Sequence, residues 1–105
     1  MSTTTKVINL TNQSIGSFAP MGARQYPIVI IASLNIAEEI ESFLKKSSYI
    51  QQPDIYAIPK VDSMLPFDWL YFHTGGMSDR KEWLCVSERV YNDTNFRAII
   101  LEYLI

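Results

Sequence analysis

The chain has 105 residues, of which 48% are hydrophobic and 19% are charged. This length and composition predict one compact soluble domain, because single hydrophobic cores span roughly 50 to 200 residues. Nine Lys and Arg residues against eleven Asp and Glu residues give a net charge of −2. That balance argues against a duplex-DNA binder, which needs a dense basic stripe. One Cys and one His exclude an internal disulfide framework and are too few for a structural zinc site, so we expect no metal and no cofactor.

The N-terminal residues 1–5 are small and polar, and we expect them to form a flexible tail ahead of a single domain over residues 6–105. They lack the apolar segment of a signal peptide. The longest aliphatic run, 28–32, is far shorter than the ~18 residues that indicate a membrane span. The sequence therefore predicts a cytoplasmic protein with no membrane partner, in which Cys85 is a free thiol.

The first half of the chain predicts two strands and a helix. Residues 6–11 form a short apolar strand pattern, and the continuous β-branched run within 26–32 is typical of a strand buried on both faces. Apolar residues recur at helical spacing over 35–46, where Asn35 is the expected N-cap and Glu38 stands three positions later. We expect a helix over 35–46, directly after the buried strand.

The second half predicts three further strands. Residues 54–59 form one of them, and if this strand pairs parallel to 26–32, the intervening helix is a right-handed crossover. Strand patterns over 69–74 and 82–87 flank a linker that contains two glycines, which predicts a hairpin.

The C-terminal segment 95–105 follows several possible N-caps and favours a helix, although its β-branched content leaves a strand open. The expected fold is therefore α/β, of the mixed α+β kind, with a small mixed β-sheet of about five strands and two helices packed on it. Because the end of this segment is almost wholly apolar, we also expect a homodimer. One helical face would hold Phe96, Ile99, Ile100, Tyr103 and Leu104.

A thiol nucleophile with an imidazole base would have to use Cys85 and His73, the only Cys and His in the chain. Such a dyad needs the two groups within roughly 3 Å of each other. If the hairpin loop spans 75–80, Thr74 faces Lys81, and His73 lies three positions from Cys85 on the opposite face, ~10 Å away. A loop shorter by one residue leaves ~13 Å. We therefore expect no catalytic dyad, and His73 is the residue to test first if any catalysis exists.

A phosphate or nucleotide site has weaker support. The predicted turn into the helix holds no glycine, but its free N–H groups, with Ser33 and Asn35, are able to bind an anion. Glu38 and Glu39 would repel that anion. His73 is the further residue of this alternative ligand site, because it stands beside two glycines.

The most distinctive feature is the concentration of aromatic residues between 67 and 91. Strand alternation places Trp69, Tyr71 and His73 on one face and Leu70 and Phe72 on the other. If the second face meets the helices, the first needs a cover of its own, from the C-terminal helix or from another molecule. Aromatic residues and Arg are common interface anchors, although the core also accounts for such rings. The candidate partner-binding residues are Phe67, Trp69, Tyr71, Arg80 and Lys81.

The opening Val7-Ile8-Asn9-Leu10-Thr11, followed by Ser14-Ile15, resembles the first strand of small phage and mobile-element proteins that begin with Asn-Leu-Thr-Pro-His-Pro-Ile. Some distant relatives of that type are CRISPR-associated accessory proteins. The resemblance covers about ten residues, and Asn12 and Gln13 stand at the Pro-His positions, so no role of that histidine carries over. It implies a mobile-element accessory protein or inhibitor.

These observations lead us to expect a non-catalytic protein–protein interaction module, such as an inhibitor, an immunity factor or an accessory subunit. The first alternative is a nucleotide-binding or ring-nuclease-like CRISPR-accessory protein that uses the turn over 32–35 and His73. The second is an RNA-binding module in which Trp69 and Tyr71 stack on bases near Arg80 and Lys81.

Overall fold

The computed structural model describes residues 6–11, 26–54 and 67–104 of the chain. The described strands form one four-stranded sheet in the order β1-β2-β4-β3. The two inner strands each have a neighbour on both sides, and β1 pairs parallel to β2 while the other pairs are antiparallel. The fold is therefore mixed α+β. Its strands are β1 (Lys6–Asn9), β2 (Ile28–Ala32), β3 (Trp69–Thr74) and β4 (Lys81–Val86).

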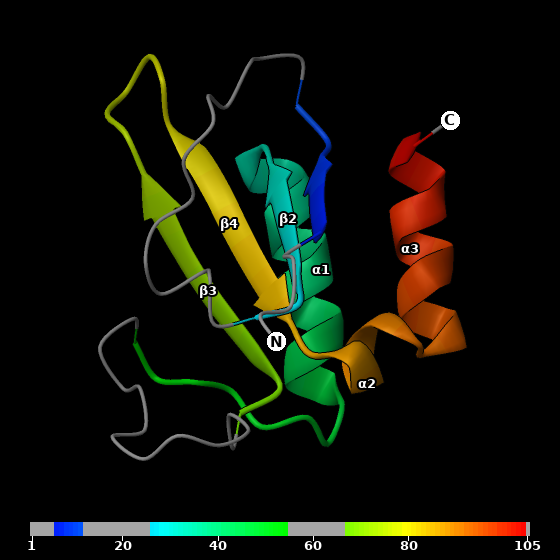
Figure 1. Cartoon of the computed structure of the whole chain (residues 1–105). Coiled ribbons are helices and arrows are strands. Elements are labelled where there is room, and N and C mark those ends of the chain that lie inside the picture. Colours follow the sequence, from blue (N-terminus) through cyan, green and yellow to red (C-terminus); the bar gives the residue numbers. More distant parts are fainter. Residues whose placement is uncertain (1–5, 12–25, 55–66, 105) are drawn as a thin grey trace.

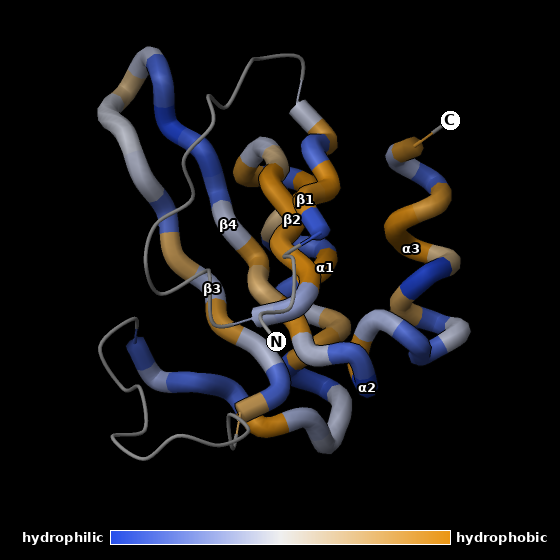
Figure 2. The backbone as a smooth tube through the Cα atoms, in the orientation of Figure 1, coloured by the Kyte–Doolittle hydropathy of each residue, from blue (hydrophilic) through white to orange (hydrophobic). Residues whose placement is uncertain are grey.

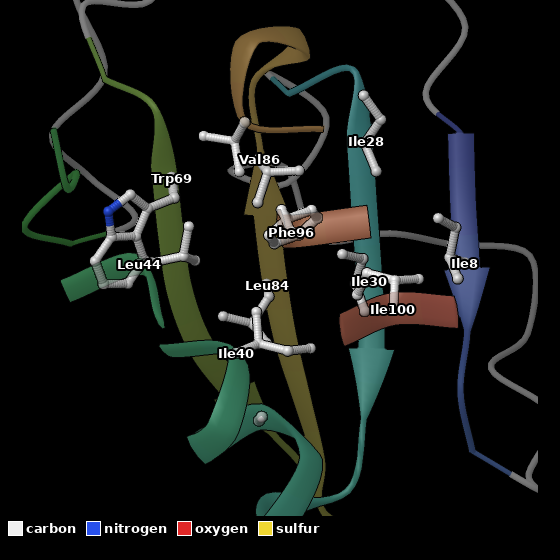
Figure 3. Close-up of a cluster of buried hydrophobic side chains, with 12 residues drawn as sticks. Ile8, Ile28, Ile30, Ile40, Leu44, Trp69, Leu84, Val86, Phe96 and Ile100 are labelled. Atoms are coloured by element: carbon white, nitrogen blue, oxygen red, sulfur yellow. The ribbon is translucent and has the colours of Figure 1, made fainter. Parts of the chain in front are cut away.

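In the part of the chain that the structure describes, three helices accompany the sheet: α1 (Leu34–Lys46), α2 (Glu88–Tyr91) and α3 (Thr94–Leu104). In Figure 1, α1 lies behind the sheet, while α2 and α3 follow β4 and stand on the side of β1. The side chains of α1 and α3 pack on the same face of the sheet, where Figure 3 shows Ile40 and Leu44 of α1 beside Phe96 and Ile100 of α3. The helices thus form one layer and the sheet forms the second.

The sheet is apolar on both faces. On the helix face, Ile30 and Leu84 pack under the helices together with the indole of Trp69. On the opposite face, a second cluster contains Tyr26, Val29, Ile31, Leu70, Trp83 and Cys85. All five residues of β2 are buried, which confirms the expectation of a strand buried on both faces. Burial of this run stabilises the fold by the hydrophobic effect, at ~25 cal/mol per Å² of apolar surface.

The helix α1 begins one residue earlier than the sequence predicted. Its N-cap is Ser33, which makes no side-chain capping hydrogen bond, and Asn35 lies within the first turn. The capping role expected of Asn35 is therefore wrong. The expected apolar face is present, because Ala37, Ile40 and Leu44 are buried. On the outer face Glu41 and Lys45 form an i,i+4 ion pair at 3.6 Å, which contributes little to stability because Lys45 is exposed.

The helix expected near the C-terminus is confirmed as α3. The Asp93 carboxylate caps it, since Oδ1 accepts the backbone N–H groups of Asn95 at 2.8 Å and Phe96 at 3.3 Å. Phe96 and Ile100 are buried, but Leu104 is 53% exposed and so does not share the buried face. Self-association through this segment stays a prediction.

Two details of the expected topology differ from the structure. Strand β2 pairs parallel with β1, whereas the sequence analysis considered, as one possibility, a parallel pairing of 26–32 with 54–59. Residues 55–59 lie outside the described part of the chain, as does the expected tail at 1–5. The short helix α2 was not expected. It begins after Ser87, whose hydroxyl accepts the backbone N–H of Val90 at 3.3 Å.

The β3–β4 hairpin has the first of the two registers that the sequence analysis considered, with Thr74 opposite Lys81 and Leu70 opposite Cys85. Its turn depends on Gly75, which has a φ of 87°. A Cβ at that position would lie 2.5 Å from the carbonyl oxygen of Asp79, so only glycine fits. The Asp79 side chain closes the loop by accepting the N–H of Gly76 at 2.7 Å.

Candidate functional site

The strand register brings three of the predicted site residues to one end of the sheet. His73 on β3 pairs with Glu82 on β4, and Glu82 pairs on its other side with Ala32 at the end of β2. Tyr71 stands two positions before His73 and therefore shares its face. Arg80 joins them from the loop that precedes β4. We call this set, Tyr71, His73, Arg80 and Glu82, the hairpin cluster.

Glu82 is the centre of the hairpin cluster and is only 1% exposed. The Tyr71 hydroxyl donates to Oε1 at 2.5 Å, and Arg80 donates from Nε to Oε2 at 2.6 Å and from Nη2 to Oε1 at 3.4 Å. Charge-assisted hydrogen bonds of this kind are about twice as strong as neutral ones. Both oxygens of this nearly buried carboxylate are therefore satisfied.

The electrostatics of the cluster follow from these bonds. Burial alone would raise the pKa of Glu82, but the hydrogen bonds from Arg80 and Tyr71 outweigh it and hold that pKa below its ordinary value. Burial, followed by the hydrogen bond to Glu82, raises the pKa of Tyr71. At neutral pH the site consequently holds an ionised carboxylate, a protonated phenol and a guanidinium. Its chemistry is that of a fixed ion pair beside an exposed imidazole.

The thiol of Cys85 is not part of this cluster. Cys85 pairs with Leu70, whereas His73 pairs with Glu82 three residues along the strand, so the two side chains project from opposite faces. Cys85 is fully buried, and this burial raises the pKa of its thiol. The geometry that the sequence predicted for these two residues is confirmed, and it separates thiol from imidazole.

The alternative ligand residues also lie at this end of the sheet. Ser33 follows Ala32 and, like Asn35 in the first turn of α1, is exposed. Glu82 pairs with Ala32, so a nearly buried carboxylate stands between this turn and His73. A negative charge in that place opposes an anionic ligand. The arrangement of Ser33, Asn35 and His73 therefore gives no support to a phosphate site here.

The predicted partner-binding residues are divided among three places. Trp69 is 1% exposed and belongs to the core under the helices, so it is not accessible for stacking on a base or for anchoring a partner. Phe67 is partly buried just before β3. Tyr71 and Arg80 belong to the hairpin cluster. Lys81 pairs with Thr74, whose Oγ1 accepts from Trp83 on the second face, so Lys81 belongs to that face and not to the hairpin cluster.

A second carboxylate, Asp68, was not among the predicted site residues. It lies directly before β3 and is 8% exposed. Arg89 donates to it from Nη2 at 2.6 Å and from Nε at 3.3 Å, Ser87 from its hydroxyl at 3.2 Å, and Ile50 from its backbone N–H at 2.9 Å. Burial raises the pKa of Asp68, but the hydrogen bond from Arg89 and the other donors lower it more. We call Asp68 with these donors the Asp68 clasp.

The register itself carried the signal that would have found Glu82. Once Thr74 faces Lys81, His73 must face Glu82, and a charged residue inside an apolar strand such as β4 indicates a local partner. The Asp68 clasp carried no comparable signal, because Ile50 on one side and Ser87 with Arg89 on the other are each far from Asp68 in the sequence. Sequence spacing does not bring such residues together.

The described residues supply no other obvious chemistry. Within residues 6–11, 26–54 and 67–104, no three His, Cys, Asp or Glu side chains gather closely enough to hold a metal ion. In the same ranges, no helix is both long and apolar enough to cross a membrane. No protein-family model matches the chain, and neither do any curated protein or solved structure.

Proposed function

We propose that this protein is a non-catalytic protein–protein interaction module and that the hairpin end of the sheet is its contact surface. The resemblance of its first strand to those of phage and mobile-element proteins suggests an inhibitor, an immunity factor or an accessory subunit. The observation that carries the proposal is Met77 at the tip of the β3–β4 hairpin, whose side chain is fully exposed.

Met77 lies between Gly76 and Ser78 in the loop that joins β3 to β4. In Figure 2 the tube is mostly white and blue over this loop, so most of its residues are neutral or hydrophilic. Exposing a large apolar side chain at such a tip gives no benefit to the folded monomer. Methionine is unbranched and polarisable, and it adapts to the shape of an apolar pocket. Met and Arg are also enriched in protein interfaces, and Arg80 follows Met77 by three positions.

The hairpin cluster supplies the rigidity that such a contact needs. Glu82 holds Arg80 and Tyr71 in fixed positions, while the side chain of Arg80 is still 44% exposed. Leu34, in the first turn of α1 at the same end of the sheet, is 45% exposed. Pre-organised side chains lose less conformational entropy on binding. The proposed surface therefore combines Leu34, His73, Met77 and Arg80.

Co-purification from cells that natively produce the chain tests this proposal. Tagged wild-type protein is expected to recover one partner in stoichiometric amount, identified by mass spectrometry. Met77→Glu places a charge where the partner's apolar pocket would be, and is expected to reduce recovery of that partner at least tenfold, about 1.4 kcal/mol.

The matched control is Leu101→Glu, because Leu101 is also an exposed apolar residue, 56% exposed, but lies on α3. This variant is expected to recover the partner as the wild type does. Circular dichroism of both variants shows whether the fold is kept. Absence of any stoichiometric partner, or equal recovery with Met77→Glu, contradicts the proposal.

A further inference from the structure

We propose that Lys6, Tyr91 and Arg97 form a binding site for a phosphate group, separate from the hairpin end of the sheet. The three residues come from the start of β1, the end of α2 and the first turns of α3. They meet on the side of the molecule where Figure 1 shows β1 and α3. Neither the sequence patterns nor the proposed interaction surface involves this place.

The side chain of Tyr91 contacts the charged groups of both Lys6 and Arg97. The Arg97 guanidinium carbon lies 4.4 Å from the centre of the Tyr91 ring, and the Lys6 Nζ lies 5.1 Å from it, within the range of cation–π contacts. Lys6 also donates a hydrogen bond from Nζ to the Tyr91 hydroxyl at 3.1 Å. Two positive charges from distant parts of the chain are thus fixed around a single ring.

Arg97 is oriented by two further hydrogen bonds. Its Nε donates to the carbonyl oxygen of Tyr91 at 2.8 Å, and its Nη2 donates to Oδ1 of Asn92 at 3.2 Å. Both acceptors are neutral, so the positive charge of the guanidinium is not compensated by them. Lys6 and Arg97 are both exposed, which leaves their remaining N–H groups accessible to a ligand.

The other two arginines in the described part of the chain each form an ion pair with a carboxylate. Arg80 donates to the Glu82 carboxylate and Arg89 to that of Asp68. Arg89 also stacks on a tyrosine, with its guanidinium carbon 4.8 Å from the Tyr49 ring. In the part of the chain that the structure describes, no carboxylate forms an ion pair with Lys6 or Arg97. The Tyr91 site is therefore a preformed cationic site whose two charges are paired with no carboxylate of residues 6–11, 26–54 and 67–104.

The nearest carboxylate in the sequence, Asp93, is already engaged. It accepts the Tyr49 hydroxyl at 2.6 Å through Oδ2, and the first N–H groups of α3 through Oδ1. These bonds lower the pKa of Asp93, with the Tyr49 hydroxyl as the largest cause. Asp93 is thus held as the cap of α3 and forms no ion pair with Lys6 or Arg97.

A phosphate group fits this site better than a carboxylate does. One arginine fork engages both coplanar oxygens of a carboxylate, as Arg89 does with Asp68. A phosphate offers three acceptor oxygens and up to two negative charges. It can therefore bind the Arg97 fork and the Lys6 ammonium together.

Titration of the ¹⁵N-labelled protein with inorganic phosphate, at constant ionic strength, tests this inference. Saturable shifts are expected for the backbone amides of Tyr91, Asn92 and Arg97. Lys6→Gln and Arg97→Gln are each expected to weaken phosphate binding about tenfold, because each removes a charged donor. Lys81→Gln, which removes a charge from the other face of the hairpin, is the matched control and is expected to bind phosphate as the wild type does.

A parallel titration with a thymidine hexanucleotide identifies the source of the phosphate. Tighter saturation by the hexanucleotide than by inorganic phosphate indicates the backbone of a single-stranded nucleic acid. The reverse order indicates a small phosphate monoester, and both results support the site. Three results overturn it: no saturable shift with either probe, an equal response to acetate, or unchanged binding in the double variant Lys6→Gln/Arg97→Gln. None of these outcomes depends on the hairpin surface, so the site and the proposed function fail independently.

Discussion

The β3–β4 hairpin contains the same pair of residue types near the start of both strands, an acid followed by a tryptophan. Asp68-Trp69 opens β3, and Glu82-Trp83 lies at the second and third positions of β4. Both carboxylates are nearly buried, and an arginine contacts each at 2.6 Å. Similar local sequence has nevertheless produced two different structural roles at the two ends of the hairpin.

The difference lies in where the hydrogen-bond donors come from. The donors to Asp68 come from the segment after α1, through Ile50, and from the junction of β4 and α2, through Ser87 and Arg89. The donors to Glu82 both belong to the hairpin itself. Asp68 therefore connects parts of the chain that are distant in sequence, whereas Glu82 fixes side chains within one local unit. The first role stabilises the fold, and the second prepares a surface.

Asp68→Ala tests the first role and is expected to have the largest effect. It leaves the N–H of Ile50 and the Ser87 hydroxyl without their acceptor, in a place that is nearly buried. Loss of a buried, multiply bonded carboxylate is expected to reduce the free energy of unfolding by about 3 kcal/mol. Urea unfolding followed by circular dichroism measures this loss. A loss under about 1 kcal/mol would show that the hydrogen bonds of the Asp68 clasp, which link segments distant in sequence, contribute little to the stability of the fold.

The pH dependence of Glu82→Gln tests the second role. Because the folded-state pKa of Glu82 lies below its ordinary value of 4.5, the ionised form stabilises the fold above that pH, and this contribution is lost as pH falls through the folded pKa. Glu82→Gln is expected to be less stable than the wild type by about 1 to 2 kcal/mol at pH 7.

The difference in stability between this variant and the wild type is expected to shrink as pH falls through the lowered folded-state pKa of Glu82. Urea unfolding at a series of pH values from 7 to 3 gives the two curves. Asp68, whose pKa is also lowered, contributes to both curves equally and cancels in their difference. A difference that is independent of pH would show that the charge of Glu82 has no part in stability.

The sequence was sufficient to predict the strands of the hairpin and to limit their register to two choices, of which the structure has the one with a loop over 75–80. The two adjacent glycines mark where the hairpin turns, and Gly75 provides the positive φ that the turn requires. It was also sufficient for α1 and α3, because their apolar residues repeat at helical spacing. The helix α2 was missed since it has four residues, too few to show a period.

The sequence could not show which face of the sheet meets the helices. Alternation correctly divides Trp69 and Tyr71 from Leu70 and Phe72, but both faces are apolar. The helices pack on the face of Trp69, opposite to the arrangement that the sequence analysis considered first. For this reason the aromatic residues expected at an interface are partly core, and the exposed apolar residue at the hairpin tip, Met77, was overlooked.

The two tryptophans of the hairpin, Trp69 and Trp83, differ in whether the indole N–H has a hydrogen-bond acceptor. The indole Nε1 of Trp83 donates to Oγ1 of Thr74 at 2.7 Å, and Trp83 stacks on Phe72 with ring centres 5.8 Å apart. The indole Nε1 of Trp69 is buried and has no hydrogen-bond partner in the described part of the chain. Burial of an indole N–H without a hydrogen-bond acceptor is unfavourable, because the group loses its hydrogen bond to water and gains none in the protein.

Substitution by phenylalanine removes the indole N–H and a similar volume at both positions. Trp83→Phe also leaves the Thr74 hydroxyl without its donor, whereas Trp69→Phe removes an unsatisfied group. Trp83→Phe is therefore expected to destabilise the protein by about 1 kcal/mol more than Trp69→Phe does, as measured by thermal and urea unfolding of the two variants. Equal losses would show that the free indole N–H of Trp69 carries no penalty. The difference between the two ends of the hairpin would then lie in the carboxylates alone, since they differ in the origin of their donors.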